Sequence, residues 1–316
     1  STSGRPSVHL SDAQAGHFRR IAQEVVANAL SQEMRYRHED GGALDENEWK
    51  FVRSKDRVRV YKRTASPTTT TGKPRMPMVL GTGYVDGTLE DVLLGVHHKT
   101  THEMRSTPGP DLLIKNRDTI TLEYMGVGED ANGSKYGFQL MRSVDHLDVF
   151  AADDVQQVLD SADDIVRGQV MFCCIYRQIS PMVVGMFSKA IFDLSGELAG
   201  YLSYYTAAEI ILGISKALQC AMAKRLTLLA MQNDVDVAQL ERKTSWLSND
   251  FIDFVGADAA RKDGCGVCLQ KRFFLSAPYQ RCRICATTAC AKCCIKTAVF
   301  VRPRAHAWAA SARPCS

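Results

Sequence analysis

The hydrophobic pattern at the start of the chain predicts one helix followed by strands. Apolar residues recur at helical spacing over residues 11–35, and the letters S-D-A-Q at the start of this segment form a capping box. Over residues 58–62 apolar and basic side chains alternate, which is the period of a strand. A second strand is predicted at residues 79–85, followed by a short capped helix over residues 88–96.

The pattern of the next part predicts more strands and a long closing helix. Residues 119–125 alternate most clearly, and a polar turn at 129–133 connects them to a hairpin partner at 136–144. A further strand is predicted at 166–176, and an apolar stripe at helical spacing covers residues 206–232. Since these strands each have one apolar face, we expect a sheet that buries a single side. The order of elements predicts an α+β domain whose last helix covers that side.

Composition is that of an ordinary globular protein. Hydrophobic residues make up 45% of the 316 positions and charged residues 23%, and the length suits one large domain plus a small one. The first residues have no apolar core of a signal peptide, and no uninterrupted run of about eighteen apolar residues occurs. We therefore expect a cytoplasmic protein.

Six cysteines near the C-terminal end form three C-x2-C pairs, at Cys265, Cys268, Cys282, Cys285, Cys290 and Cys293. Such a pair places two sulfurs near one metal ion, and Zn²⁺ prefers four ligands in a tetrahedron. Three pairs supply more sulfurs than one zinc site can take. The spacing therefore indicates an interleaved two-metal module in which the first and third pairs share one zinc. The second pair then needs ligands further on, and Cys315 or His306 is the candidate. Disulfides of a secreted domain or free cysteines are the alternatives, but nothing marks secretion, and pairs spaced by two residues are poor disulfide partners.

The cysteine block resembles a FYVE-type zinc finger. The stretch RCRICATTACAKC at residues 281–293 matches that family's C-x2-C-G-x3-C-x2-C spacing, with Ala286 in place of the glycine. Members bind phosphatidylinositol 3-phosphate on endosomal membranes through a basic R-K-H-H-C-R run. Here the run reads P-Y-Q-R-C-R and lacks both histidines. The resemblance implies a peripheral membrane role, with contacts expected from Lys271, Arg272, Arg281 and Arg283.

Charge is distributed unevenly along the chain. Residues 261–316 contain eleven Lys and Arg and one acid, whereas the remainder has 28 basic and 34 acidic residues. A basic module on an acidic body indicates an anionic partner, either a membrane or a nucleic acid. The same cations also offset the negative charge of thiolate-bound zinc, so both interpretations hold together.

The large domain resembles a START lipid-binding domain. The resemblance is carried by the short motifs W-K-x-V at Trp49, V-R-V-Y-K-R at 58–63, N-R-D at 116–118 and V-R-G at 166–168, and by the long last helix. It implies a helix-grip fold, in which a curved antiparallel sheet and the closing helix enclose an apolar tunnel for one lipid. The expected division is a disordered N-terminus at 1–7, the START-like domain at 8–232, a linker at 233–260 and the incomplete finger at 261–316.

Four residues are candidates for the wall of this tunnel, Arg117, Leu122, Tyr124 and Arg167. An arginine inside a tunnel would hold a lipid headgroup or a buried acid, because an unpaired buried charge is costly. A surface position is the alternative for both arginines.

No pattern in the chain indicates catalysis. The phosphate-binding glycine loop and the G-x-S-x-G elbow are absent, and Cys173 and Cys174 have no sequence neighbour that would lower the pKa of a thiol. We therefore expect a non-enzymatic lipid-binding or lipid-transfer adaptor, which contains zinc and binds an anionic membrane. The alternative is a zinc-finger adaptor for protein interaction, ubiquitin ligation or nucleic acid. Aromatic residues beside the cations of the finger are compatible with nucleic acid, but we expect an anionic membrane and not a nucleic acid as the partner.

Overall fold

The computed structural model describes residues 10–64, 78–97, 117–118, 120–144, 166–193, 200–229, 264–271, 278–282, 287–298 and 308–312. The expected disordered segment at 1–7 and the linker at 233–260 lie outside these residues. The chain divides into two compact units, Ser1–Leu218 and Gln219–Ser316. Each unit is described by itself below.

The first unit begins with helix α1, Asp12–His38. Ser11 accepts the backbone N–H of Gln14, and the Gln14 side chain in turn accepts the backbone N–H of Ser11, so the predicted capping box is present. The buried positions of α1 follow helical spacing and are Phe18, Ala22, Val26, Ala29 and Glu33. The helix therefore packs through a narrow stripe that ends in a carboxylate.

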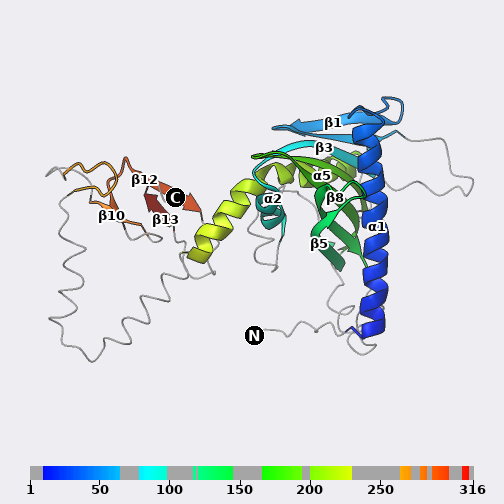
Figure 1. Ribbon diagram of the computed structural model, residues 1–316, viewed down its shortest axis with the longest axis horizontal. Helices are drawn as coiled ribbons and strands as arrows, with labels where there is room; N and C mark the ends of the chain where they lie inside the picture. Colours follow the sequence, from blue (N-terminus) through cyan, green and yellow to red (C-terminus); the bar gives the residue numbers. More distant parts are fainter. Residues whose placement is uncertain are drawn as a thin grey trace, which may run out of the picture. The chain divides into compact units, whose positions relative to one another are not determined.

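Seven strands form one antiparallel sheet in the order β1-β2-β3-β9-β8-β6-β5 (Figure 1). Their bounds are β1 Trp49–Lys55, β2 Val58–Arg63, β3 Met78–Asp86, β5 Thr121–Glu129, β6 Lys135–Ser143, β8 Gln169–Ser180 and β9 Val183–Asp193. The predicted hairpin pairs Thr121 with Ser143 and Glu129 with Lys135. Two short parallel strands, β4 Arg117–Asp118 and β7 Val166–Arg167, pair separately. The longest strands, β8 and β9, are neighbours in the middle of the sheet; β8 was predicted in part, over residues 166–176, and β9 was not predicted.

Helices cover the sheet from both sides. Helix α2, Leu89–Val96, begins at the predicted cap of Thr88 and Asp91. The closing helix is α5, Gly200–Gly213, which continues through a short 3-10 turn, Ile214–Lys216, and further helical residues to Leu229. The α+β helix-grip fold is thus confirmed: a seven-stranded antiparallel sheet with a long C-terminal helix, followed in the chain by the cysteine cluster.

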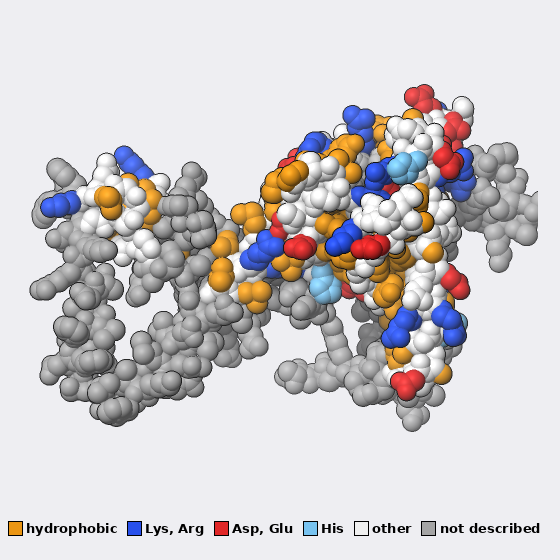
Figure 2. Space-filling model, viewed as in Figure 1, with side chains coloured by type: hydrophobic (Ala, Val, Ile, Leu, Met, Phe, Trp, Pro, Cys, Tyr) orange, Lys and Arg blue, Asp and Glu red, His pale blue; other side chains and the backbone are white. Residues whose placement is uncertain are grey.

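The closing helix is unusually apolar. An 18-residue window within Ser203–Leu229 is apolar enough to cross a membrane by length and composition, but half of that window is buried inside the protein, as in a core helix. Its last turns expose apolar side chains, among them Met222, Leu228 and Leu229, and Figure 2 shows apolar side chains gathered along this part.

Both faces of the sheet are buried, and the expectation of a single buried side is wrong. On one face, Cys174 and Tyr176 of β8 pack in a core with Ile211 of α5. On the other face, Cys173 and Ile175 pack with α1. A nearby cluster of Trp49, Leu80 and Phe187 continues this second core, and Tyr36 of α1 packs against it. We call the two sides the α5 face and the α1 face.

The second unit contains the last turns of the closing helix, to Leu229, and beyond them its described residues form short strands and turns. Strand β10, Gln280–Arg281, pairs with β11, Thr288–Ala289, and β12, Cys294–Ala298, pairs with β13, Trp308–Ala312. Its small core consists of Cys265, Cys282 and Ala289, with Tyr279 packed against them.

Candidate functional site

The first and third cysteine pairs meet in space. The sulfurs of Cys265, Cys268, Cys290 and Cys293 all lie within 4.8 Å of one another, and the Cys268 and Cys290 sulfurs are 3.9 Å apart. Four sulfurs at about 2.3 Å from one tetrahedral Zn²⁺ would be about 3.8 Å apart. The four thiols can therefore hold a metal ion with little rearrangement, as the spacing predicted.

Tight turns hold these sulfurs in position. After Cys265 the backbone turns back, so that Leu269 N–H donates to the Cys265 carbonyl at 2.8 Å and Leu269 takes a positive φ of 60°. The backbone N–H groups of Val267 and Cys290 point at the Cys265 sulfur, at 3.4 and 3.3 Å. Gly266 is needed for close packing, since an added Cβ would lie 2.6 Å from Thr287. N–H groups directed at a sulfur stabilise a thiolate.

The electrostatics of the cluster also suit a cation. Burial opposes ionisation of the Cys265 thiol, but the backbone N–H groups around its sulfur outweigh it and lower its pKa to about 6. The pKa of Cys293 rises to about 12, because its hydrogen bond to Cys290 and its burial favour the thiol. Four sulfurs this close cannot all ionise alone, and a divalent cation removes the conflict.

The structure describes only some of the other predicted zinc ligands and membrane-binding residues. Cys282 is buried in the small core of the finger and is absent from the four-sulfur group. Lys271 is exposed beside the first turn. The side chain of Arg281 and all of Cys285, Cys315, Arg272 and Arg283 lie outside the described residues, so the second zinc site stays a prediction.

On the α5 face the closing helix lies directly on part of the sheet. An added Cβ at Gly81 of β3 would lie 2.4 Å from Ile211, and one at Gly95 of α2 would lie 2.0 Å from the Ala217 carbonyl oxygen. Further along this face, Met141 of β6 and Val170 of β8 pack against the same core but stay only partly buried. Beside the contact with the helix, the α5 face therefore carries apolar side chains that are not fully covered.

A buried polar pair lies inside this core, and no pattern in the sequence indicated it. The Tyr176 hydroxyl donates to the Gln139 side-chain oxygen at 3.2 Å, and the Gln139 amide donates to the Val96 carbonyl at 3.4 Å. Tyr176 is fully buried, and burial raises the pKa of its phenol well above the usual value. The pair links β8, β6 and the end of α2 without leaving a polar atom of either side chain unpaired.

Two of the four tunnel candidates do not face the closing helix. Leu122 and Tyr124 pack with the α1 core, and the Tyr124 ring lies 5.0 Å from Phe138. Side chains alternate across a strand, so the neighbouring Glu123 is the residue on the α5 face. The side chains of Arg117 and Arg167 lie outside the described residues, although their backbones pair in β4 and β7.

Sequence comparisons give no match, whereas structure comparison gives solved structures that are similar to this chain. No family model matches the chain, and no curated protein matches it. Human StAR-related lipid transfer protein 5 is similar over 64% of this chain and 98% of its own, at 18% identity and a TM-score of 0.40. Human STARD10 is similar over 68% of this chain and 83% of its own, at 15% identity and a TM-score of 0.40. A fragment of a STAR-related lipid transfer protein from Xanthomonas axonopodis is similar over 54% of this chain and 96% of its own, at 14% identity and a TM-score of 0.38.

Proposed function

We propose that this protein is a non-enzymatic lipid-binding or lipid-transfer adaptor, which holds one lipid between the sheet and the closing helix. The observation that carries the proposal is the α5 face itself. A long apolar helix covers the sheet there, while Met141 and Val170 beside it remain partly exposed. A lipid chain laid against such side chains would remove apolar surface from water, at about 25 cal/mol per Å².

The cysteine module is proposed to direct the protein to membranes. In this proposal it is a FYVE-like finger with zinc on the four clustered cysteines, and it binds an anionic surface that contains phosphatidylinositol 3-phosphate. Leu269 supports a membrane contact, because its side chain is 81% exposed beside Lys271 at the end of the first turn. An exposed apolar side chain next to a cation suits the interface of an anionic bilayer. The protein would then lie on the cytoplasmic side of endosomal-type membranes.

Photolabelling tests the lipid site. The purified full chain would be loaded with a phosphatidylcholine that carries a diazirine in its acyl chain, irradiated and digested for mass spectrometry. We expect adducts on β6, β8 and α5, and native mass spectra that show one lipid per chain. Met141→Trp should reduce labelling by filling the site, whereas Tyr124→Trp, on the opposite face of the sheet, should not.

Two results would refute lipid carriage. One is a folded protein that retains no lipid and labels no more than a control protein. The other is labelling confined to α1 or to the finger, which would show that the lipid binds outside the α5 face. The finger would then have to supply the function alone.

Vesicle sedimentation tests the membrane proposal separately. Binding to vesicles with phosphatidylinositol 3-phosphate should fall with added salt and after charge reversal at Lys271, Arg272, Arg281 and Arg283. Leu269→Ser should weaken binding at every salt concentration, because it removes apolar contact and no charge. Unchanged binding in both variants would refute membrane targeting by the finger.

A further inference from the structure

A second concave surface lies on the α1 face, on the other side of the sheet from the proposed lipid site. Its volume is about 850 Å³, which is in the range of pockets for drug-sized ligands. The C-terminal part of α1, the loop after it, strands β1 to β3 and the adjoining ends of β8 and β9 line it. We call it the α1 cavity.

Aromatic side chains form much of the wall of the α1 cavity. Tyr36 and Phe187 lie with ring centroids 5.2 Å apart, and Trp49 is buried in the same cluster. Tyr61 and Tyr84 also line the cavity, and Tyr84 is 49% exposed. A planar ligand would find stacking surfaces on these rings.

Hydrogen-bond donors are available beside the rings. The Tyr36 hydroxyl accepts a hydrogen bond from Thr82 at 3.1 Å, so the phenolic proton of Tyr36 remains free to be donated. Burial raises the pKa of Tyr36, which keeps the phenol protonated. Arg59 lines the cavity with an exposed side chain and forms no hydrogen bond or ion pair within the part of the chain that the structure describes.

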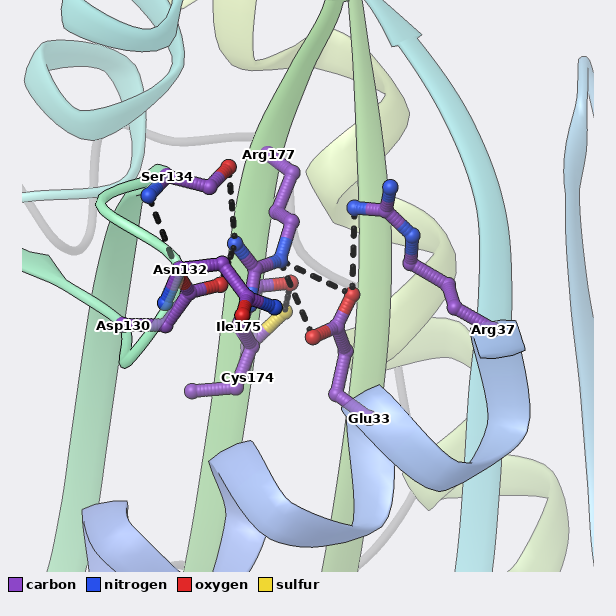
Figure 3. Close-up of polar contacts among 8 residues, drawn as sticks. All are labelled: Glu33, Arg37, Asp130, Asn132, Ser134, Cys174, Ile175 and Arg177. Carbon is purple, nitrogen blue, oxygen red and sulfur yellow. Dashed lines mark hydrogen bonds and ion pairs between the residues drawn. The ribbon is translucent and has the colours of Figure 1, made fainter. Parts of the chain in front are cut away.

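Four arginines and three acids line the cavity, Arg37, Arg57, Arg59 and Arg177 against Glu33, Glu46 and Asp56, which gives the lining a formal charge of +1. Of the acids that line it, Glu33 is buried and already paired with Arg177 at 3.0 Å and with Arg37 at 3.7 Å (Figure 3). Arg177 is itself only 3% exposed, and its buried Nη2 has no hydrogen-bond partner among the residues that the structure describes. The buried Glu33 carboxylate is therefore satisfied, and Glu46 and Asp56 are exposed. Among the described residues, Arg59 is the lining arginine whose exposed side chain has no partner, since Arg57 pairs with Asp86.

We propose that the α1 cavity binds an aromatic organic anion of metabolite size. Its ring system would stack in the wall of Tyr36, Tyr61 and Phe187, and its carboxylate, sulfonate or phosphate would bind Arg59 and the Tyr36 hydroxyl. An arginine can bind such a group through two parallel hydrogen bonds, which gives the site its preference for an anion. This site is independent of the proposed lipid site, because the sheet separates the two.

The test uses a matched set of probes on the full chain. 1-Anilinonaphthalene-8-sulfonate carries the ring system and the acid, N-phenyl-1-naphthylamine carries only the ring system, and sulfate carries only the acid. Titrations would be followed by amide chemical shifts in ¹⁵N-labelled protein. We expect the sulfonate to shift amides that line the α1 cavity, such as those of Gly42, Gly83 and Gly185, with saturation at one site. The amine should bind there at least tenfold more weakly, since it lacks the charge-assisted hydrogen bonds.

Variants decide which residue holds the acid. Arg59→Gln should weaken sulfonate binding about tenfold, while Arg19→Gln, an exposed change on α1 outside the cavity, should leave it unchanged. Tyr36→Phe should weaken binding less, because it removes one donor. Equal binding by wild type and Arg59→Gln, or shifts confined to the α5 face or the finger, would overturn the proposal. So would the same shifts with sulfate alone, which would mark an adventitious ion only.

Discussion

The buried ion pair between α1 and β8 makes a quantitative prediction about stability. Arg177 donates from Nε to both carboxylate oxygens of Glu33, at 3.1 and 3.0 Å, and from Nη1 to Asp130 at 2.7 Å and to Ser134 at 3.2 Å (Figure 3). The side chains of Arg177 and Glu33 are each 4% exposed. Replacing Arg177 with Met would keep most of the volume but leave the Glu33 carboxylate buried without its main partner.

The expected cost follows from that burial. Removing one partner of a buried pair typically costs about 3–5 kcal/mol. Arg37 remains 3.7 Å from Glu33 and compensates part of the charge, so we expect the lower end, about 3 kcal/mol. Arg35→Met is the matched control, because Arg35 is 70% exposed in its pair with Glu39 and should contribute about 0–1 kcal/mol.

Urea unfolding measured by far-UV circular dichroism would give the free energies, and hydrogen exchange of α1 amides would locate the effect. Glu33→Gln combined with Arg177→Met should cost less than the two single changes added, with a coupling of about 1–3 kcal/mol. If Arg177→Met costs no more than Arg35→Met, or if the double variant is additive, the pair does not hold α1 on the sheet.

The contact between Arg177 and Asp130 gives a pH dependence of stability with a definite sign. The backbone N–H of Ser134 and the ion pair with Arg177 lower the pKa of Asp130. Stability from a depressed carboxyl pKa is present above the unfolded value of about 3.9 and is lost as the pH falls through the folded value. The stability difference between wild type and Arg177→Met should therefore narrow in acid. A difference that stays constant from pH 7 to pH 3 would contradict this role of Asp130.

Three further predictions concern packing and the cysteine cluster. Gly95→Ala should cost about 1–3 kcal/mol or more in urea unfolding, because its Cβ would lie 2.0 Å from the Ala217 carbonyl oxygen. Gly16→Ala, in α1 with nothing within 4 Å of its Cβ, should instead stabilise by about 0.5–1 kcal/mol, and a loss there would contradict the packing of α1. Metal analysis of fresh, reduced protein should find at least one zinc per chain, and Cys268→Ser should lower it. Cys294→Ser, outside the four-sulfur group, should not, and equal zinc in both variants would exclude the proposed site.

Local signals in the sequence were enough for the helix caps, one hairpin and the cysteine pairing. A capping box and a C-x2-C turn each involve residues within four positions, so spacing alone determines what they can form. The meeting of the first and third pairs was predicted from the interleaved arrangement of two-metal modules, because the spacing alone does not choose which two of the three pairs share a metal ion.

The central strands of the sheet could not be predicted as well. Strand β8 is buried from Phe172 through Arg177 on both sides, so its pattern shows no alternation, and β9 is interrupted by polar residues. Lys189 of β9 is one of them, and its ammonium lies 5.5 Å from the Trp49 ring centroid. Such contacts depend on where α1 and β1 pack, which no window of the sequence contains.

The buried ion pair between Glu33 and Arg177 was missed for the same reason, although the position of Glu33 in the sequence pattern pointed to its burial. Glu33 and Arg177 are 144 positions apart, and the arginines that drew attention were Arg117 and Arg167. Glu33 nevertheless continues the stripe of Phe18, Ala22, Val26 and Ala29 at helical spacing. A carboxylate on the buried stripe of a helix indicates a buried cation opposite it, but not which one.

The narrow stripe of α1 connects its stability to the α1 cavity. Only five of its 27 residues are buried, two of them alanines, so apolar burial holds this helix weakly and the Glu33 pair matters more. Tyr36, whose ring and hydroxyl line the cavity, lies one turn after Glu33 on the same helix. If the C-terminal end of α1 packs less firmly on the sheet, Tyr36 is no longer held in the wall of the α1 cavity. Arg177→Met should therefore weaken binding of the sulfonate probe as well as lower the stability of the protein. Conversely, a bound anion should slow hydrogen exchange at the end of α1, because a ligand that binds only the docked helix stabilises it by mass action.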